Sequence, residues 1–161
     1  MTERRPRKAG RPELRLARLA AAQALYQIEL TGRPAQIVVG EFTELRLDDV
    51  LGTNDGEEPA AADPDWFARV VTGAWAAHER LDPAIERHLA TGWTLERSGF
   101  PFRACLRAGA FELAECPDVP VAVVIDEYVE VAHALLTGDE PKVVHAILDR
   151  LARSLRPTAG A

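Results

Sequence analysis

The sequence predicts an all-α protein of about seven helices. Along most of the 161 residues, apolar side chains recur every three or four positions, which is the period of a helix. The two strand-like runs, QIVV (36–39) and PVAVVI (120–125), each lie inside a longer helical pattern. Gly and Pro residues separate the periodic segments, as expected for helix ends.

The first half contains two predicted helices and a loop. Residues 14–31 form an apolar stripe that stops at Thr31-Gly32. The second helix begins near Pro34 and continues to about Val50. Residues 52–65, GTNDGEEPAAADPD, are rich in Gly, Pro and acidic residues, so we expect a loop there.

The second half contains five predicted helices. Residues 66–81 and 82–93 are predicted as two separate helices, because Asp82 followed by Pro83 is a typical helix start. The other three cover residues 101–115, 118–136 and 140–155. Three parts of the chain follow: a basic flexible segment (1–12), an N-terminal helical subdomain (13–93) with the acidic loop 52–65, and a C-terminal helical subdomain (94–161).

Composition restricts the location and the chemistry. No apolar run is long enough to span a membrane and the N-terminus has no signal-peptide core, so we expect a cytoplasmic protein. Cys105 and Cys116 are too few for a disulfide framework and are predicted to be reduced, buried thiols. The sequence has no Gly-rich phosphate loop, no nucleophile elbow and no metal-ligand spacing, so we expect no catalysis, cofactor or metal.

Positive charge is concentrated at the N-terminus of an acidic chain. The first eighteen residues carry seven basic groups against two acids, whereas the whole chain has 19 basic and 25 acidic residues. The basic residues are Arg4, Arg5, Arg7, Lys8, Arg11, Arg15 and Arg18. A solvated tail would explain the first of these, but Arg11, Arg15 and Arg18 are spaced by four and three and form one helical stripe. Because arginine binds phosphate bidentately, this stripe predicts a nucleic-acid contact.

Two charged residues lie near the apolar stripes of C-terminal helices. Arg107 and Glu127 would be costly to bury unpaired. We therefore expect a structural ion pair between them.

Three motifs, in order, resemble the NusB family of transcription antitermination factors. The stretch ARLAAAQALYQIEL (17–30) is similar to the family's first-helix signature. FRACLRAGAFELAECPDVPVAVVIDEYVEVA (102–132) is similar to its second signature, and KVVHAILDRLAR (142–153) to its last helix. The resemblance implies two small helical bundles that bind single-stranded boxA RNA of ribosomal RNA leaders, with NusE, a ribosomal small-subunit protein, as partner in an antitermination complex on RNA polymerase.

The resemblance also implies roles for particular residues. Arg15, Arg18 and Lys142 fall on RNA-binding positions of the family. Tyr26 matches a residue at the NusE surface, although packing on a neighbouring helix would explain it equally well. Phe102 stands where the family places an acidic residue implicated in the partner contact.

A different class of function stays open. The chain could be a protein-interaction module that docks an acidic partner or a second copy of itself, forming a homodimer. Residues 41–65, with nine acids and a single base, Arg46, could supply such a surface.

Overall fold

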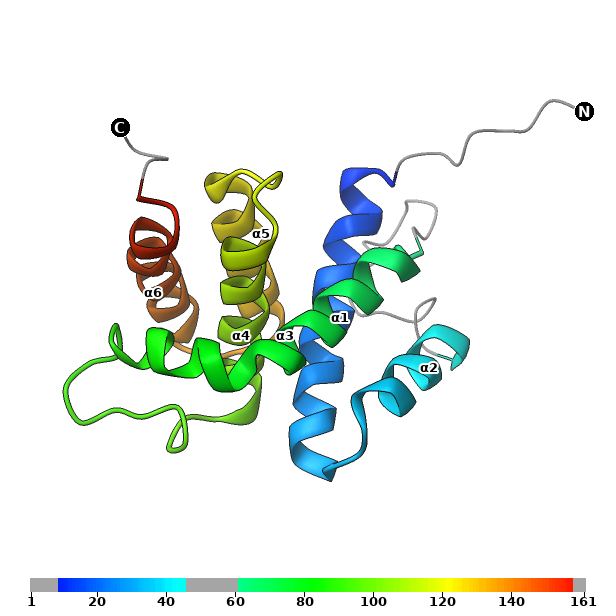
Figure 1. Cartoon of the computed structure of the whole chain (residues 1–161), viewed down its shortest axis with the longest axis horizontal. Helices are drawn as coiled ribbons and strands as arrows, with labels where there is room; N and C mark the ends of the chain where they lie inside the picture. Colours follow the sequence, from blue (N-terminus) through cyan, green and yellow to red (C-terminus); the bar gives the residue numbers. More distant parts are fainter. Residues whose placement is uncertain (1–8, 46–60, 158–161) are drawn as a thin grey trace, which may run out of the picture.

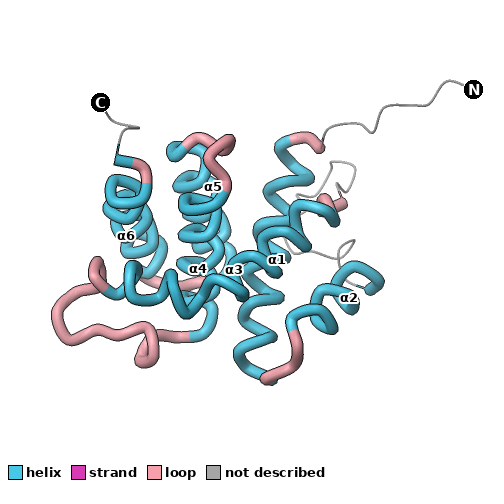
Figure 2. Tube along the Cα trace, viewed as in Figure 1, coloured by secondary structure: helices cyan, strands magenta, loops and turns pink. Residues whose placement is uncertain are grey.

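A computed structural model describes residues 9–45 and 61–157 of the chain, and in these ranges every regular element is a helix (Figure 2). The described elements are α1 (Arg11–Thr31), α2 (Ala35–Leu45), α3 (Pro64–Glu86), α4 (Phe100–Glu115), α5 (Val121–Leu135) and α6 (Glu140–Leu155). The predicted all-α class is therefore confirmed, with six described helices instead of about seven.

Helix α4 occupies the centre of the array. It packs against α1, α3, α5 and α6, while α2 packs against α1 and α3. Figure 1 shows α3 running across the other helices, from α1 and α2 at one side toward α6 at the other. The N-terminal helix is thereby held against both α4 and α5.

Two glycines allow the helices to approach α4 closely. A Cβ atom on Gly73 of α3 would lie 2.3 Å from the ring of Phe111 on α4. A Cβ atom on Gly109 of α4 would lie 2.9 Å from the side chain of Leu148 on α6. The missing side chains therefore set the distances at which α3 and α6 pack on the central helix.

The prediction of two helices over 66–93 was wrong. Residues 64–86 form the single helix α3, with Pro83 inside it. Leu81 and Ile85, on either side of Pro83, are both buried and continue the apolar stripe of the helix. Their burial offsets the cost of an interior proline, about 3 kcal/mol. Asp82, the predicted start of the second of these helices, lies within α3. Helix α3 itself begins after Asp63, whose side chain caps the helix by accepting a hydrogen bond from the Trp66 amide.

One hydrophobic core cluster includes residues of all six described helices. It extends across the predicted boundary at residues 93 and 94, and the division into subdomains stays a prediction. Both cysteines are free and buried, as expected, and burial raises the pKa of Cys105 to about 12. Among the described helices, none is both long and apolar enough to cross a membrane.

Candidate nucleic-acid interface

The basic N-terminal residues fall partly outside the structure's described range. Arg4, Arg5, Arg7 and Lys8 lie outside it, as do residues 46–60, which hold most of the proposed acidic surface. Helix α1 begins at Arg11, with a proline in its first turn. The last three arginines of the basic run are therefore on a helix, as predicted, and the helix starts inside the segment 1–12 that was expected to be flexible.

The predicted arginine stripe passes from the surface into the core. The side chain of Arg11 is 78% exposed, that of Arg15 is 45% exposed and that of Arg18 is only 4% exposed. Two residues of the stripe therefore lie at the surface, as predicted. The third does not, so the prediction that all three arginines form one surface for nucleic acid was wrong at Arg18.

The outer two arginines share one carboxylate on α5. Arg15 donates from Nε to Oε2 of Glu127 over 2.9 Å and from Nη2 to Oε1 over 3.1 Å. The Nε of Arg11 lies 3.5 Å from Oε1 of the same residue. Burial alone would raise the pKa of Glu127, but the hydrogen bonds and charge of Arg15 outweigh it and hold this pKa below its ordinary value. Two cations on one anion leave this cluster with a net positive charge.

Arg18 forms a buried network with α4 and α5. Its Nε and Nη2 donate to the carboxylate of Glu112, both over 2.9 Å at their shortest. The Tyr128 hydroxyl donates to the same carboxylate, and burial raises the pKa of that hydroxyl well above its ordinary value. The Trp66 ring of α3 covers the guanidinium, with its centroid 5.6 Å from Cζ. Arg18 therefore joins four helices, and its side chain has no free surface for a phosphate.

The predicted pair of Arg107 and Glu127 does not form. Arg107 donates to Asp82 of α3 from Nε over 2.9 Å and from Nη2 over 2.7 Å, and its Nη1 contacts Glu29 of α1. Glu127 instead accepts a hydrogen bond from Arg15 of α1. The error has a simple cause: α1 lies against α5 and supplies the cation, a contact that α4 and α5 considered alone could not reveal.

Arg103, which precedes Arg107 by one turn, has a structural role that the sequence did not predict. It pairs with Glu29 and donates from Nη1 to backbone carbonyl oxygens of the loop between α3 and α4. The carbonyl groups belong to Leu95, Glu96 and Ser98, at 2.7, 3.1 and 2.8 Å. The guanidinium thereby fixes the loop onto α4.

The remaining predicted contacts lie elsewhere. Lys142 is exposed in the first turn of α6, which begins at the end of the array opposite to the start of α1 (Figure 1). Tyr26 is partly buried and packs edge-on against the Phe100 ring, with centroids 6.1 Å apart. Phe102 belongs to the core, so the expectation that its side chain faces a partner was wrong. The structure thus groups Arg11 with Arg15 and leaves Lys142 apart from them.

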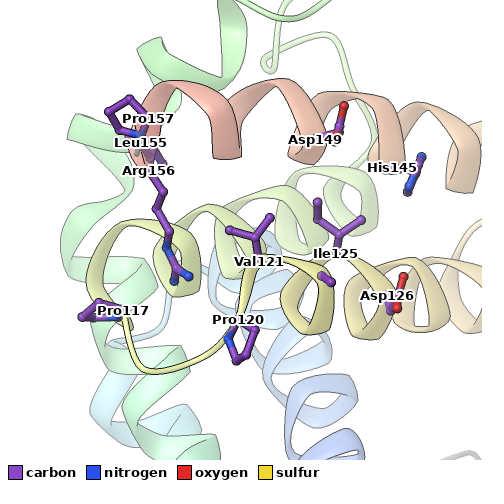
Figure 3. A pocket seen from close by; sticks show the side chains of 11 residues that line it. Pro117, Pro120, Val121, Ile125, Asp126, His145, Asp149, Leu155, Arg156 and Pro157 are labelled. Atoms are coloured by element: carbon purple, nitrogen blue, oxygen red, sulfur yellow. The ribbon is translucent and has the colours of Figure 1, made fainter. Parts of the chain in front are cut away.

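A groove between α5 and α6 offers acidic groups instead of free cations (Figure 3). Asp126 and His145 lie on its facing walls, together with Asp149. Its one arginine, Arg156, donates 2.7–2.9 Å hydrogen bonds to the carbonyl oxygens of Glu112, Leu113 and Cys116, and a shorter one to Val119. This guanidinium therefore fastens the end of α6 to the turn between α4 and α5.

The chain's described parts contain no group of three or more potential metal ligands. The charged groups that sequence reasoning missed are mainly the partners of the arginines. Glu112 interrupts an apolar run of α4, and an acid at such a position signals a buried cation nearby. Which cation it would be depends on how α1 packs, and no local pattern contains that information.

Comparison with known proteins decides the family. The family model described as the NusB family matches residues 15–153. The chain belongs to the NusB family. It is 46% identical to a transcription antitermination protein NusB of Allorhizobium ampelinum over 89% of this chain and 88% of the relative, and 48% identical to one of Sinorhizobium fredii over 87% and 86%.

Solved structures agree with this assignment. The NusB of T. maritima superimposes with a TM-score of 0.73 at 26% identity, covering 96% of this chain and 99% of that one. A crystal structure of antitermination factors NusB and NusE in complex with double-stranded RNA shares the fold, with a TM-score of 0.71 at 21% identity over 90% and 99% of the two chains. This NusB-family chain is a transcription antitermination factor and not an enzyme.

Proposed function

We propose that this chain binds single-stranded boxA RNA of ribosomal RNA leaders together with NusE and so helps to assemble an antitermination complex on RNA polymerase. The exposed pair Arg11 and Arg15 carries the proposal. It continues a basic run whose other members are Arg4, Arg5, Arg7 and Lys8. The site of action would be the cytoplasm, where bacterial transcripts are made.

Electrostatics supports a limited RNA surface at the start of α1. The rest of the chain, after the first eighteen residues, holds 12 basic and 23 acidic groups, so it would repel a polyanion over most of its surface. Binding strength depends on how many phosphates are neutralised, and a few arginines neutralise few. We therefore expect modest affinity for RNA without a partner.

The role of a partner follows from that modest affinity. A protein that binds this chain and adds its own RNA contacts would raise the affinity for RNA, and the coupling is reciprocal. NusE is the proposed partner, because a NusB of the same fold has been solved with NusE and RNA. Tyr26, partly exposed beside Phe100, is the residue through which we expect the partner contact.

A titration of labelled boxA RNA with this protein tests the proposal. NusE is absent and then saturating, at two salt concentrations, with boxA also presented as a duplex. We expect NusE to tighten single-stranded boxA binding at least several-fold, and boxA to tighten NusE binding by the same factor. The adaptor role is wrong if NusE leaves the RNA affinity unchanged while the protein alone forms a concentration-dependent dimer. Single-strand preference is wrong if the duplex binds as tightly.

Two variants, each of which removes the arginine of an interhelical ion pair, test where RNA binds. Arg15→Gln removes an arginine of the proposed surface, and Arg80→Gln removes an exposed arginine that pairs with Glu115 between α3 and α4. Only Arg15→Gln should weaken RNA binding. Equal losses in both variants would mean that RNA responds to net charge alone and not to this surface.

A further inference from the structure

We propose that Glu127 is a positioning residue for RNA, which holds the guanidinium of Arg15 in the orientation that meets a phosphate. The inference rests on the proposed function and deepens it. Its basis is the bidentate contact across α1 and α5, in which Nε and Nη2 of Arg15 bond to the two carboxylate oxygens of Glu127. Such a fork fixes the plane of the guanidinium as well as its place.

Burial in the pair is strongly asymmetric. The side chain of Glu127 is 2% exposed, whereas that of Arg15 is 45% exposed. The anion therefore lies beneath the cation, and a phosphate approaching from solvent meets the guanidinium first. Nη1 of Arg15 donates to no residue within the described parts of the chain, so it is available to a phosphate oxygen.

A side chain that is already oriented before binding loses less entropy when it binds a ligand. A free arginine side chain loses rotamer entropy when it is fixed. In Arg15 much of that loss is incurred on folding, because the fork to Glu127 already holds the side chain. RNA binding is then stronger for the same contact.

Glu127 could also have the opposite effect, because a carboxylate near an RNA surface repels phosphate. Two observations favour positioning. Among the three hydrogen-bonded side chains, Arg11 and Arg15 outnumber the carboxylate of Glu127, so these three together carry one positive charge. Glu130, one turn further along α5, is an exposed acid that also acts on Arg15 through its charge, and it has no hydrogen bond to Arg15. The two acids thus carry the same negative charge, but only Glu127 forms hydrogen bonds with Arg15.

This difference provides the test. Glu127→Gln and Glu130→Gln each remove one negative charge near the proposed surface. If the acids only repel RNA, both variants bind boxA RNA more tightly than the wild type. Positioning predicts that Glu127→Gln binds several-fold more weakly and that Glu130→Gln binds as tightly or more tightly. The log–log salt slope of Glu127→Gln should flatten by up to about 0.7, the value of one phosphate contact on single-stranded RNA.

Arg15→Lys is the second variant, because it keeps the charge at an exposed position but cannot form the fork. It should weaken boxA binding several-fold, and wild-type affinity in this variant would contradict the inference even if Glu127→Gln does not fold. The inference is overturned if folded Glu127→Gln, or Arg15→Lys, binds RNA as tightly as the wild type. If the wild type itself does not bind boxA, the proposed function fails instead, so the two failures are distinguishable.

Discussion

Arg15 and Arg18 lie less than one turn apart on α1, and each donates from Nε and Nη2 to a buried carboxylate on another helix. Their surroundings differ. Arg15 is close to half exposed, whereas Arg18 is enclosed by α3, α4 and α5. The same side chain on the same helix therefore serves as a surface cation at one position and as a structural link at the other.

Burial determines what an ion pair does. An enclosed pair has lost its hydration, so removing one partner leaves an uncompensated charge in the core. A pair at the surface keeps part of its hydration and contributes little to stability, but its cation stays accessible to a ligand. Variants that remove these charges test whether the two ion pairs differ in this way.

The largest effect is expected at Arg18. Arg18→Met should lower the free energy of unfolding by about 3–5 kcal/mol, because it leaves the carboxylate of Glu112 buried without its cation. Urea unfolding followed by circular dichroism measures this loss. Adding Glu112→Leu and Tyr128→Phe replaces the whole network by apolar groups and should restore most of the stability. A single variant as stable as the wild type would contradict the assignment.

A smaller loss of stability is expected when Arg107 is removed from its partly exposed partners Asp82 and Glu29. Arg107→Leu should cost about 2 kcal/mol, because Asp82 and Glu29 keep some access to solvent after the cation is removed. Double-mutant cycles should give a coupling energy with Asp82→Asn and none with Glu127→Gln. Coupling with Glu127 would instead support the pair that the sequence predicted.

The next largest effect is expected on the affinity for boxA RNA when the Arg15–Glu127 pair is removed. The double variant Arg15→Gln/Glu127→Gln removes both charges, so the net charge of the protein is unchanged. We expect boxA RNA to bind at least about tenfold more weakly, the value of one charge-assisted hydrogen bond. Fluorescence anisotropy across a salt series measures it, with the matched Arg80→Gln/Glu115→Gln variant as control. Wild-type affinity in the Arg15 double variant would remove Arg15 from the RNA surface.

The smallest effect concerns acid stability. The pKa of Glu127 is lower in the folded protein than its ordinary value of 4.5, so its contribution to stability is fully present above that value. The contribution is lost as the pH falls below 4.5 through the folded-state pKa. The unfolding free energy of Glu127→Gln should therefore fall less steeply in this acid range than that of the wild type. Parallel curves for the two proteins would contradict the lowered pKa.

Much of the fold could be predicted from the sequence, because helical periodicity is a local property. Helices α1, α4, α5 and α6 were predicted within a few residues of their ends. The error at α3 arose where a local signal, Asp82 followed by Pro83, was outweighed by the tertiary burial of Ile85. Proline changes the local preference, but the core decides whether the helix continues.

The candidate site could be predicted only in part. Spacing correctly placed Arg11, Arg15 and Arg18 on one helical stripe, because spacing determines the face of a helix. It could not show that this face enters the core after Arg15, since that depends on which helices lie against α1. The partners of Arg15, Arg18 and Arg107 are more than 20 residues away in the sequence, so no local motif joins them.

The most direct test measures boxA affinity of two variants side by side, counted per folded molecule in the presence of NusE. One variant is Arg15→Gln, and the other is Arg18→Met/Glu112→Leu/Tyr128→Phe, whose stability is expected to be largely restored. We predict that Arg15→Gln loses RNA affinity while the apolar replacement of the Arg18 network binds RNA like the wild type. If the folded Arg18 variant loses RNA binding and Arg15→Gln keeps it, the division of α1 into an RNA-binding outer part and a structural inner part is wrong.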